Sequence, residues 1–471
     1  MLPRFDAPTN SLVTNSLVLA LMVWVWGGTA LAQDRPVYSN LRYDEDWSAM
    51  GNITQASDQW DPVKHIALGG EAYLSLGGDA RVRYEYFRNP GFGAGRQDAN
   101  GYGLQRYMLH GDLRINSWWR VFGQLQHSQE SGRLGGPRSF DENKLDVHQA
   151  FVDIGPWQTT QNYTALRLGR QELEFPFARL MSVRDGRNTR ITFQGGRFIH
   201  QRPDWRGAVW ALWPVRIDPN EFDDEWDATQ LAGGAGYTRY GFLTPKGNIA
   251  ITYHLFNERF ARYEQGTAPE HRHGLGARLW GVIGGFDYNY EAVYQFGNFG
   301  DADIRAWDLA TDTGYRWNEI RFQPRLGVRF DVTSGDGNLN DNRLGNFNPL
   351  FAATAYSGLA GLIGPSNAID LAPSVTVRFA NGANLTFGTA MFWRHSIQDG
   401  VYDLDLNLIR SGKNSRARFV GQQWTLQANW PLTTHASLAA TLSYFDTGRF
   451  LRETGTAKNV VYFTAWWNYR I

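Results

Sequence analysis

LSLGGDARVRYEYF, residues 74–87, alternates apolar and polar side chains with a period of two. Successive side chains of a β-strand point to opposite sides of the sheet, so this stretch predicts a strand with two chemically different faces. One face suits lipid and the other suits water. The polar face carries Ser75, Asp79, Arg81, Arg83 and Glu85.

The same division recurs at residues 106–115, 286–295 and 325–333. Alternation alone is compatible with either a water-soluble β-sandwich or a membrane-spanning barrel. The connections favour the barrel, because short polar links such as 116–118 and 380–383 alternate with long ones. Bacterial barrels place short turns on the periplasmic side and long loops outside.

The longer links are expected at residues 88–102, 259–272 and 334–368, among others. Strands placed between the links number about eighteen, and an even number returns both chain ends to the periplasm. We therefore expect an all-β protein, a transmembrane antiparallel up-and-down β-barrel in the bacterial outer membrane.

Both ends of the chain carry targeting features. An apolar run at 17–26 followed by Ala30-Leu31-Ala32 predicts a signal peptide over residues 1–32, since the run is far shorter than the roughly twenty residues of a spanning helix. Residues 33–70 are then a periplasmic lead-in segment, and residues 71–471 the barrel. Residues 461–471 alternate again, which resembles the terminal strand that the outer-membrane assembly machinery reads, with Ile471 where phenylalanine is usual.

Composition excludes several other classes. The 46 basic and 46 acidic residues balance, so a nucleic-acid partner is not expected. Cysteine is absent, which excludes disulfides and thiolate catalysis. Only five of the basic residues are lysines, and arginine offers fixed, paired donors to carboxylates.

Several segments together resemble the alginate export family of outer-membrane porins. They are LRYDEDW at 41–47, LRLGRQEL at 166–173, the stretch 184–193, GDGN at 335–338 leading to FNPLF at 347–351, and FWR at 392–394. The resemblance spans most of the mature chain. It implies a barrel that conducts an anionic polysaccharide or a small anion, delivered by periplasmic proteins.

A polyuronate carries one carboxylate per sugar, so its passage needs cations that compensate charge at several weak sites in series. Strand parity predicts that eight arginines face the lumen: Arg81, Arg83, Arg106, Arg114, Arg325, Arg329, Arg378 and Arg394. The resemblance adds three near a constriction: Arg170, Arg184 and Arg190. We expect an export channel for an alginate-like polysaccharide, or alternatively a diffusion porin for small anions or sugars.

Other interpretations remain open at this point. A structural role is the alternative for each arginine, because pairing with a neighbouring carboxylate satisfies buried charge by itself. No serine or histidine motif indicates an enzyme, and no cofactor or metal site is expected. The acidic stretch 218–227 is expected to be a solvated external loop, and 336–341 matches a calcium loop poorly. A closed adhesin barrel is a further alternative.

Overall fold

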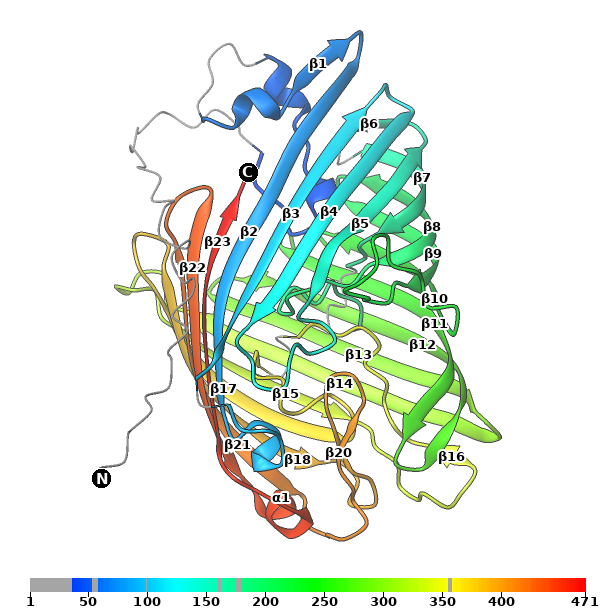
Figure 1. Ribbon diagram of the computed structural model, residues 1–471, viewed down its shortest axis with the longest axis vertical. Helices are drawn as coiled ribbons and strands as arrows, with labels where there is room; N and C mark the ends of the chain where they lie inside the picture. Colours follow the sequence, from blue (N-terminus) through cyan, green and yellow to red (C-terminus); the bar gives the residue numbers. More distant parts are fainter. Residues whose placement is uncertain (1–35, 53–57, 99, 160–161, 175–179, 355–357) are drawn as a thin grey trace, which may run out of the picture. The chain divides into compact units, whose positions relative to one another are not determined.

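Eighteen long strands, each hydrogen-bonded to the next in an antiparallel sense, make up most of the part of the chain that the structure describes. The computed structural model describes residues 36–471 apart from 53–57, 99, 160–161, 175–179 and 355–357. The signal peptide predicted over 1–32 lies outside the described residues. The last strand, β23 (Val460–Arg470), pairs with the first long one, β2 (Ala72–Arg88), and this closes the sheet into a barrel (Figure 1).

The remaining barrel strands, in chain order, are β3 (Tyr102–Arg114), β4 (Trp119–Ser131), β5 (Asn143–Ile154), β7 (Asn162–Gln171), β8 (Phe193–Arg202), β9 (Trp205–Pro214), β10 (Gln230–Tyr240), β11 (Gly247–Tyr263), β12 (Gly266–Ile283), β13 (Phe286–Phe299), β14 (Ala302–Arg316), β15 (Arg325–Thr333), β17 (Ala368–Arg378), β18 (Asn384–Arg394), β21 (Phe419–Pro431) and β22 (Ala436–Thr447).

Short elements decorate the barrel: β1 (Ile66–Gly69), β6 (Trp157–Thr159), β16 (Arg343–Leu344), β19 (Val401–Tyr402), β20 (Leu408–Arg410), the single-turn helices η1 (Arg42–Asp44), η2 (Ser48–Asn52), η3 (Asp61–Val63) and η4 (Pro90–Gly93), and α1 (Arg449–Thr454). Among the described residues, no helix is long and apolar enough to cross a membrane. The fold class and the strand count predicted from the alternation are confirmed.

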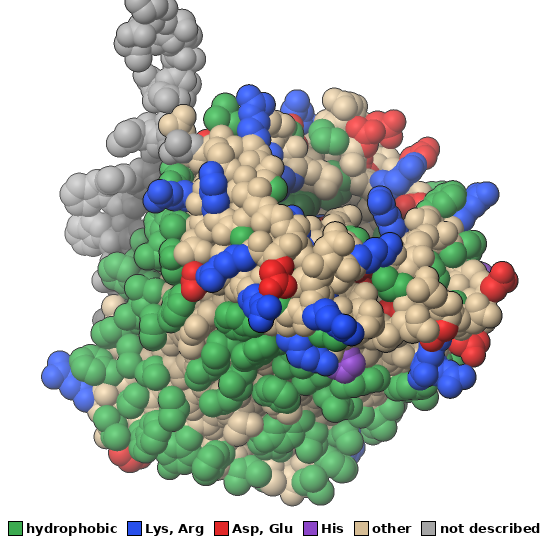
Figure 2. All heavy atoms as spheres, turned by 90° about the horizontal axis from the view of Figure 1, so that it is seen from below, with side chains coloured by type: hydrophobic (Ala, Val, Ile, Leu, Met, Phe, Trp, Pro, Cys, Tyr) green, Lys and Arg blue, Asp and Glu red, His purple; other side chains and the backbone are tan. Residues whose placement is uncertain are grey.

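The two faces of each strand separate as the period of two requires. On β2, Val82 and Tyr84 are exposed on the outer flank, whereas Arg81 and Arg83 are buried on the inner side. Figure 2 shows the end of the barrel that carries the long loops, where charged side chains gather over the loops and hydrophobic side chains cover the flank. The outer flank is therefore suited to hydrocarbon.

One predicted loop is wrong. The chain was expected to leave the sheet over 259–272, but β11 continues to Tyr263 and β12 starts at Gly266, with two residues between them. On the inner face, the Tyr263 hydroxyl donates to Glu270 at 2.7 Å, and Glu270 accepts from Arg272 Nε at 2.7 Å. This buried network satisfies the polar groups that a solvated loop would have exposed.

The barrel interior is not uniformly polar. Apolar residues of the connections after β7 and β15 pack against inner residues of β8 to β14 and form a buried cluster that includes Phe193, Phe256 and Phe351. A second cluster near α1 includes Phe392 and Phe450. Loops that fold inward bring apolar side chains with them, and these side chains need apolar partners once they leave water. Part of the interior is therefore a packed core.

Candidate functional site: arginines around an inward loop

The connection between β7 and β8, residues 172–192, turns into the barrel, and we call it the inner loop. The structure describes all of it except 175–179. The backbone amide of Ser182 donates to the Phe351 carbonyl at 3.0 Å, and the amide of Phe351 donates to the Leu180 carbonyl at 2.8 Å. The inner loop is thus tied by backbone pairing to the connection between β15 and β17.

Three arginines predicted from strand parity hold the tip of the inner loop. Arg81 Nη1 donates to the Asp185 carbonyl at 2.6 Å, and Arg83 Nη1 donates to the Gly186 carbonyl at 2.6 Å. Arg106 Nη2 lies 2.7 Å from Asp185 Oδ1. The alternation of β2 and β3 places these side chains inside, and the inner loop brings their acceptors within reach.

The carboxylate of Asp185 lies among three guanidiniums. Arg106 is in direct contact, while Arg81 Nη1 and Arg190 Nε are each 3.8 Å from a carboxylate oxygen. Burial alone would raise the pKa of Asp185, but Arg106, Arg190 and Arg81 hold that pKa well below its usual range. Asp185 is therefore an anion at neutral pH, and its side chain remains 40% exposed to the interior.

Arg190 joins the inner loop to its neighbours. Its Nε lies 2.8 Å from Glu172 Oε1, and its Nη2 donates to the Asn40 carbonyl of the lead-in segment at 3.0 Å. His148 Nε2 lies 2.8 Å from the same Glu172 oxygen. Glu172 raises the pKa of Arg190 against the opposing effect of burial.

Arg184 ties the inner loop to two other loops. Nε donates to the Ala352 carbonyl at 3.1 Å, and Nη2 donates to the Leu350 carbonyl at 3.1 Å. Nη1 is paired with Asp405 of the β18–β21 connection. Burial, together with the charge of nearby Arg187, lowers the pKa of Arg184 to about 10 despite Asp405.

Arg394 is completely buried at the end of β18. Its guanidinium donates five hydrogen bonds, all to backbone carbonyls, with the shortest to Ala417 at 2.6 Å and others to Ile397, Asp399 and Ser415. The cation is held by neutral acceptors that belong to the β18–β21 connection.

Two of the predicted arginines contact segments other than the inner loop. Arg114 Nη2 donates to the Glu45 carbonyl at 3.1 Å, so it holds the lead-in segment. Arg170 does not join the cluster around Asp185: Nη1 donates to the Val147 carbonyl at 2.7 Å, and Nη2 lies 2.9 Å from Asp223. The acidic loop 218–227 therefore folds back onto the barrel through Arg170.

Most of that acidic loop is exposed, as expected of a solvated loop, but Asp224 is buried. Asp224 is 1% exposed and accepts a hydrogen bond from Asn143 Nδ2 at 2.8 Å. Burial raises its pKa to about 6, and the nearby charge of Asp146 adds to this rise. No group of three or more histidine, aspartate or glutamate side chains that could hold a metal is found in the described part of the chain.

The remaining predicted arginines lie on β15 and β17. Arg325 is half-buried between Asp287 and Asp312, with Nη2 3.0 Å from Asp312. Arg329 lies between two carboxylates that face each other across the strands, at 3.1 Å from Asp331 and 3.1 Å from Asp370.

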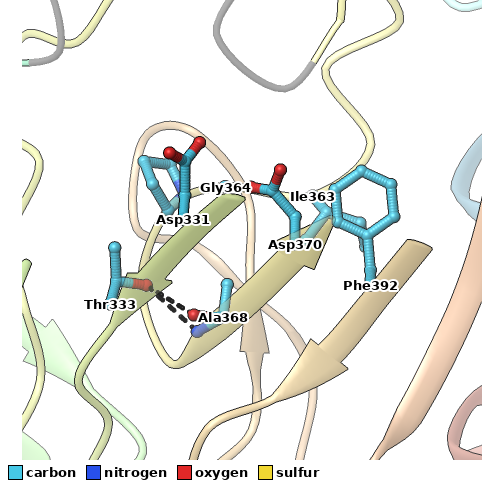
Figure 3. Close-up of a pocket in the computed structure, with 8 residues that line it drawn as sticks. Asp331, Thr333, Ile363, Gly364, Ala368, Asp370 and Phe392 are labelled. Atoms are coloured by element: carbon cyan, nitrogen blue, oxygen red, sulfur yellow. Dashed lines mark hydrogen bonds between the residues drawn. The ribbon is translucent and has the colours of Figure 1, made fainter. Parts of the chain in front are cut away.

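Figure 3 shows Asp331 and Asp370 on the same side of the sheet, beside Ile363 and Gly364 of the β15–β17 connection. Like charges opposite each other destabilise a sheet unless a cation lies between them. Arg378 has the inward parity but is exposed at the end of β17.

Sequence reasoning missed a second group of buried arginines. Arg167 is fully buried, pairs with Asp153 at 2.7 Å, and lies over the rings of Phe151 and Tyr43 at 3.8 and 4.2 Å. Arg167 lies between Leu166 and Leu168, which are exposed on the outer flank, so the alternation along β7 identifies Arg167 as inward-facing. The contact with Tyr43 has no such local signal.

A closed barrel with an apolar flank and a polar interior crossed by loops is the architecture of a bacterial outer-membrane channel. The family model described as alginate export matches residues 72–463, and the chain belongs to this family. The resemblance found in the sequence motifs is thereby confirmed, as is the location in the bacterial outer membrane.

Solved structures show the same fold. The chain is similar to OpdR of Pseudomonas aeruginosa, with a TM-score of 0.54, 10% identity, and coverage of 85% of this chain and 96% of that one. OpdK of the same organism, solved with vanillate, gives a TM-score of 0.55 at 11% identity, over 84% of this chain and 98% of that one. No curated protein matches at the level of sequence.

Proposed function

We propose that the protein exports an anionic polysaccharide of the alginate type across the outer membrane, through a lumen whose positive charge comes from arginines. Membership of the alginate export family supports a polyuronate as the cargo. The observation that carries the proposal is that several interior guanidiniums are held by neutral carbonyl oxygens. The carbonyl groups that hold Arg394 leave its charge uncancelled, whereas Arg81 and Arg184 also contact Asp185 and Asp405.

The argument rests on the difference between satisfying a hydrogen bond and neutralising a charge. A carbonyl oxygen accepts from a guanidinium without carrying a formal charge of its own. Arg394 is held in this way by all five of its hydrogen bonds, and Arg184 and Arg81 are held so in part. Fixed cations in a low-dielectric interior attract anions more strongly than they would in water.

Asp185 marks a place where a cargo carboxylate would be stabilised. Its own carboxylate has guanidiniums on several sides and is partly open to the interior. A sugar carboxylate passing beside Asp185 would lie in the positive field of Arg81, Arg106 and Arg190. Because these arginines keep protein partners, each contact with the cargo is weak, which permits release as well as binding.

The lead-in segment would receive the polymer on the periplasmic side. We propose that residues 1–32 are removed after export, and that 33–70 face the periplasmic proteins that deliver the chain. The carboxyl-terminal strand β23 would serve the assembly machinery, since it is the strand that closes the barrel against β2.

A diffusion channel for small anions is the second candidate. The observation in its favour is that Arg184 and Arg187 of the inner loop both contact Asp405, which joins loops from opposite parts of the chain within the interior. A passage narrowed in this way suits a solute smaller than a polymer. The similar barrel of OpdK was solved with vanillate, a small carboxylate.

Planar bilayer recordings of the purified protein separate the two candidates. Under a salt gradient, the reversal potential is expected to show preference for anions. Oligouronates added to the periplasmic side are expected to block current more strongly as their length increases, and neutral oligosaccharides of equal length are the control. Block by single small carboxylates that does not increase with oligomer length would favour the diffusion channel, and cation preference would contradict both.

A further inference from the structure

The outer flank of the barrel contains a groove over β8, β9, β10 and β11, which lie side by side (Figure 1). Its volume is about 670 Å³. Phe198 on β8 and Tyr253 on β11 form the two walls, and Gly207 and Ala235 on the strands between them form the floor. We call this feature the flank groove.

The groove follows from the register of two outward-facing rows of side chains that cross the four strands. In one row, Phe198, Val209, Ala235 and Tyr253 lie opposite one another on successive strands. In the next row, towards the short turn between β8 and β9, the corresponding residues are His200, Gly207, Tyr237 and Ile251. The small residues Gly207 and Ala235, set among these bulkier ones, leave an open channel across β9 and β10.

One end of the groove is aromatic. The ring of Trp205 lies 4.8 Å from His200 and 5.7 Å from Tyr237, measured between ring centroids. These residues stand next to the short turn between β8 and β9, on the periplasmic side. Aromatic side chains of barrels concentrate at the level of the lipid headgroups. This end of the groove therefore lies at the periplasmic interface of the outer membrane.

Two arginines flank the aromatic end. Arg202 on β8 and Arg239 on β10 both lie directly opposite Trp205 on β9. Arg239 pairs with Asp204 at 2.5 Å in an exposed contact. Arg202 is exposed and lies 3.4 Å from Asn162 and from the Gln201 carbonyl. The headgroup level thus presents two cations and one carboxylate beside an apolar channel.

We propose that the flank groove binds one phospholipid of the periplasmic leaflet, with an acyl chain in the channel and the phosphate at Arg202 and Arg239. The lining of the groove is mainly apolar, so the channel suits a flexible hydrocarbon chain. The order of the features matches the lipid: basic residues at the interface, then aromatic rings, then an apolar cavity directed into the bilayer.

Native mass spectrometry of the intact barrel in detergent tests the proposal, with phosphatidylglycerol and diacylglycerol as probes. Ala235→Phe fills the floor of the groove, whereas Ala292→Phe makes the same change on the outward face of β13 and serves as control. Wild type and Ala292→Phe are expected to retain one phosphatidylglycerol, and Ala235→Phe is expected to lose it. The double variant Arg202→Gln, Arg239→Gln is expected to lose phosphatidylglycerol but to keep diacylglycerol.

Heat-modifiable electrophoretic migration establishes that each variant is a folded barrel before it is compared. Equal retention of phosphatidylglycerol by folded Ala235→Phe and wild type would overturn the proposal. So would a change in self-association of Ala235→Phe, measured by sedimentation, without a change in bound lipid, because the occupant would then be a second copy of the chain.

Discussion

The phenol of Tyr43, in the lead-in segment, donates a 2.8 Å hydrogen bond to the carbonyl of Glu172, at the start of the inner loop. The Tyr43 ring is buried and packs edge-on against Phe122 and Phe151 on the inner wall. Burial raises the pKa of the Tyr43 phenol, so it stays protonated and remains a donor. The lead-in segment and the inner loop are therefore joined by a buried hydrogen bond.

Breaking this link should loosen the inner loop. Tyr43→Phe removes one buried hydrogen bond, at a cost of about 1 kcal/mol, and Tyr43→Ala also leaves a cavity that raises the cost to about 3–5 kcal/mol. Single-channel recordings should show larger current fluctuations in the order wild type, Tyr43→Phe, Tyr43→Ala. Tyr107→Ala, on the exposed outer face, is the control. Equal noise in all four proteins would refute the coupling.

Asp185→Asn should raise the preference for anions. The change removes the carboxylate that lies 2.7 Å from Arg106 Nη2 at the tip of the inner loop, and the guanidiniums keep their charge. Arg106→Gln should shift the reversal potential in the opposite direction. A matched control is Asp303→Asn, which alters an exposed pair with Arg305. Shifts of the same sign in Asp185→Asn and Arg106→Gln would argue against an electrostatic role.

Substitutions of Arg394 separate the effect of its positive charge from the effect of its hydrogen bonds. Lysine keeps the charge but cannot reproduce five bonds in a planar fork, whereas methionine loses both. Arg394→Lys is expected to increase loop fluctuations in current recordings with little change in ion preference. Arg394→Met is expected to increase fluctuations and also to reduce anion preference. If the lysine variant lost selectivity as fully as the methionine variant, the fixed charge would not be its source.

The β18–β21 connection should respond to pH near neutrality. Burial raises the pKa of Asp399 to about 7, although hydrogen bonds from Tyr402, Asn346 and the amides of Asp336 and Gly400 oppose part of this rise. The unfolded value is about 3.9. A raised pKa in the folded state means that the stabilising contribution is complete below about pH 4 and is lost as the pH rises through about 7.

Current noise from the loops should therefore increase between about pH 6 and about pH 8. Asp399→Asn, which stays neutral, should remove this step while leaving any effect of other groups. A step of unchanged size in Asp399→Asn would show that a different group titrates.

The sequence alone determined which side of the barrel each strand residue faces. Alternation on β2 placed Arg81 and Arg83 inside and Val82 and Tyr84 outside, and the structure agrees. This works because a period of two is a local property of extended backbone, and because a membrane penalises any other arrangement. The strand number followed from the same pattern.

Tertiary structure alone decided what the inward arginines touch. Arg170 turns to the acidic loop rather than to Asp185, and Tyr43 reaches Glu172 across 129 positions of the chain. The continuation of β11 to Tyr263 depended on a buried network with Glu270 and Arg272. Such contacts join residues whose separation along the chain carries no periodic signal, so only the packing of the inward loops against the wall sets them.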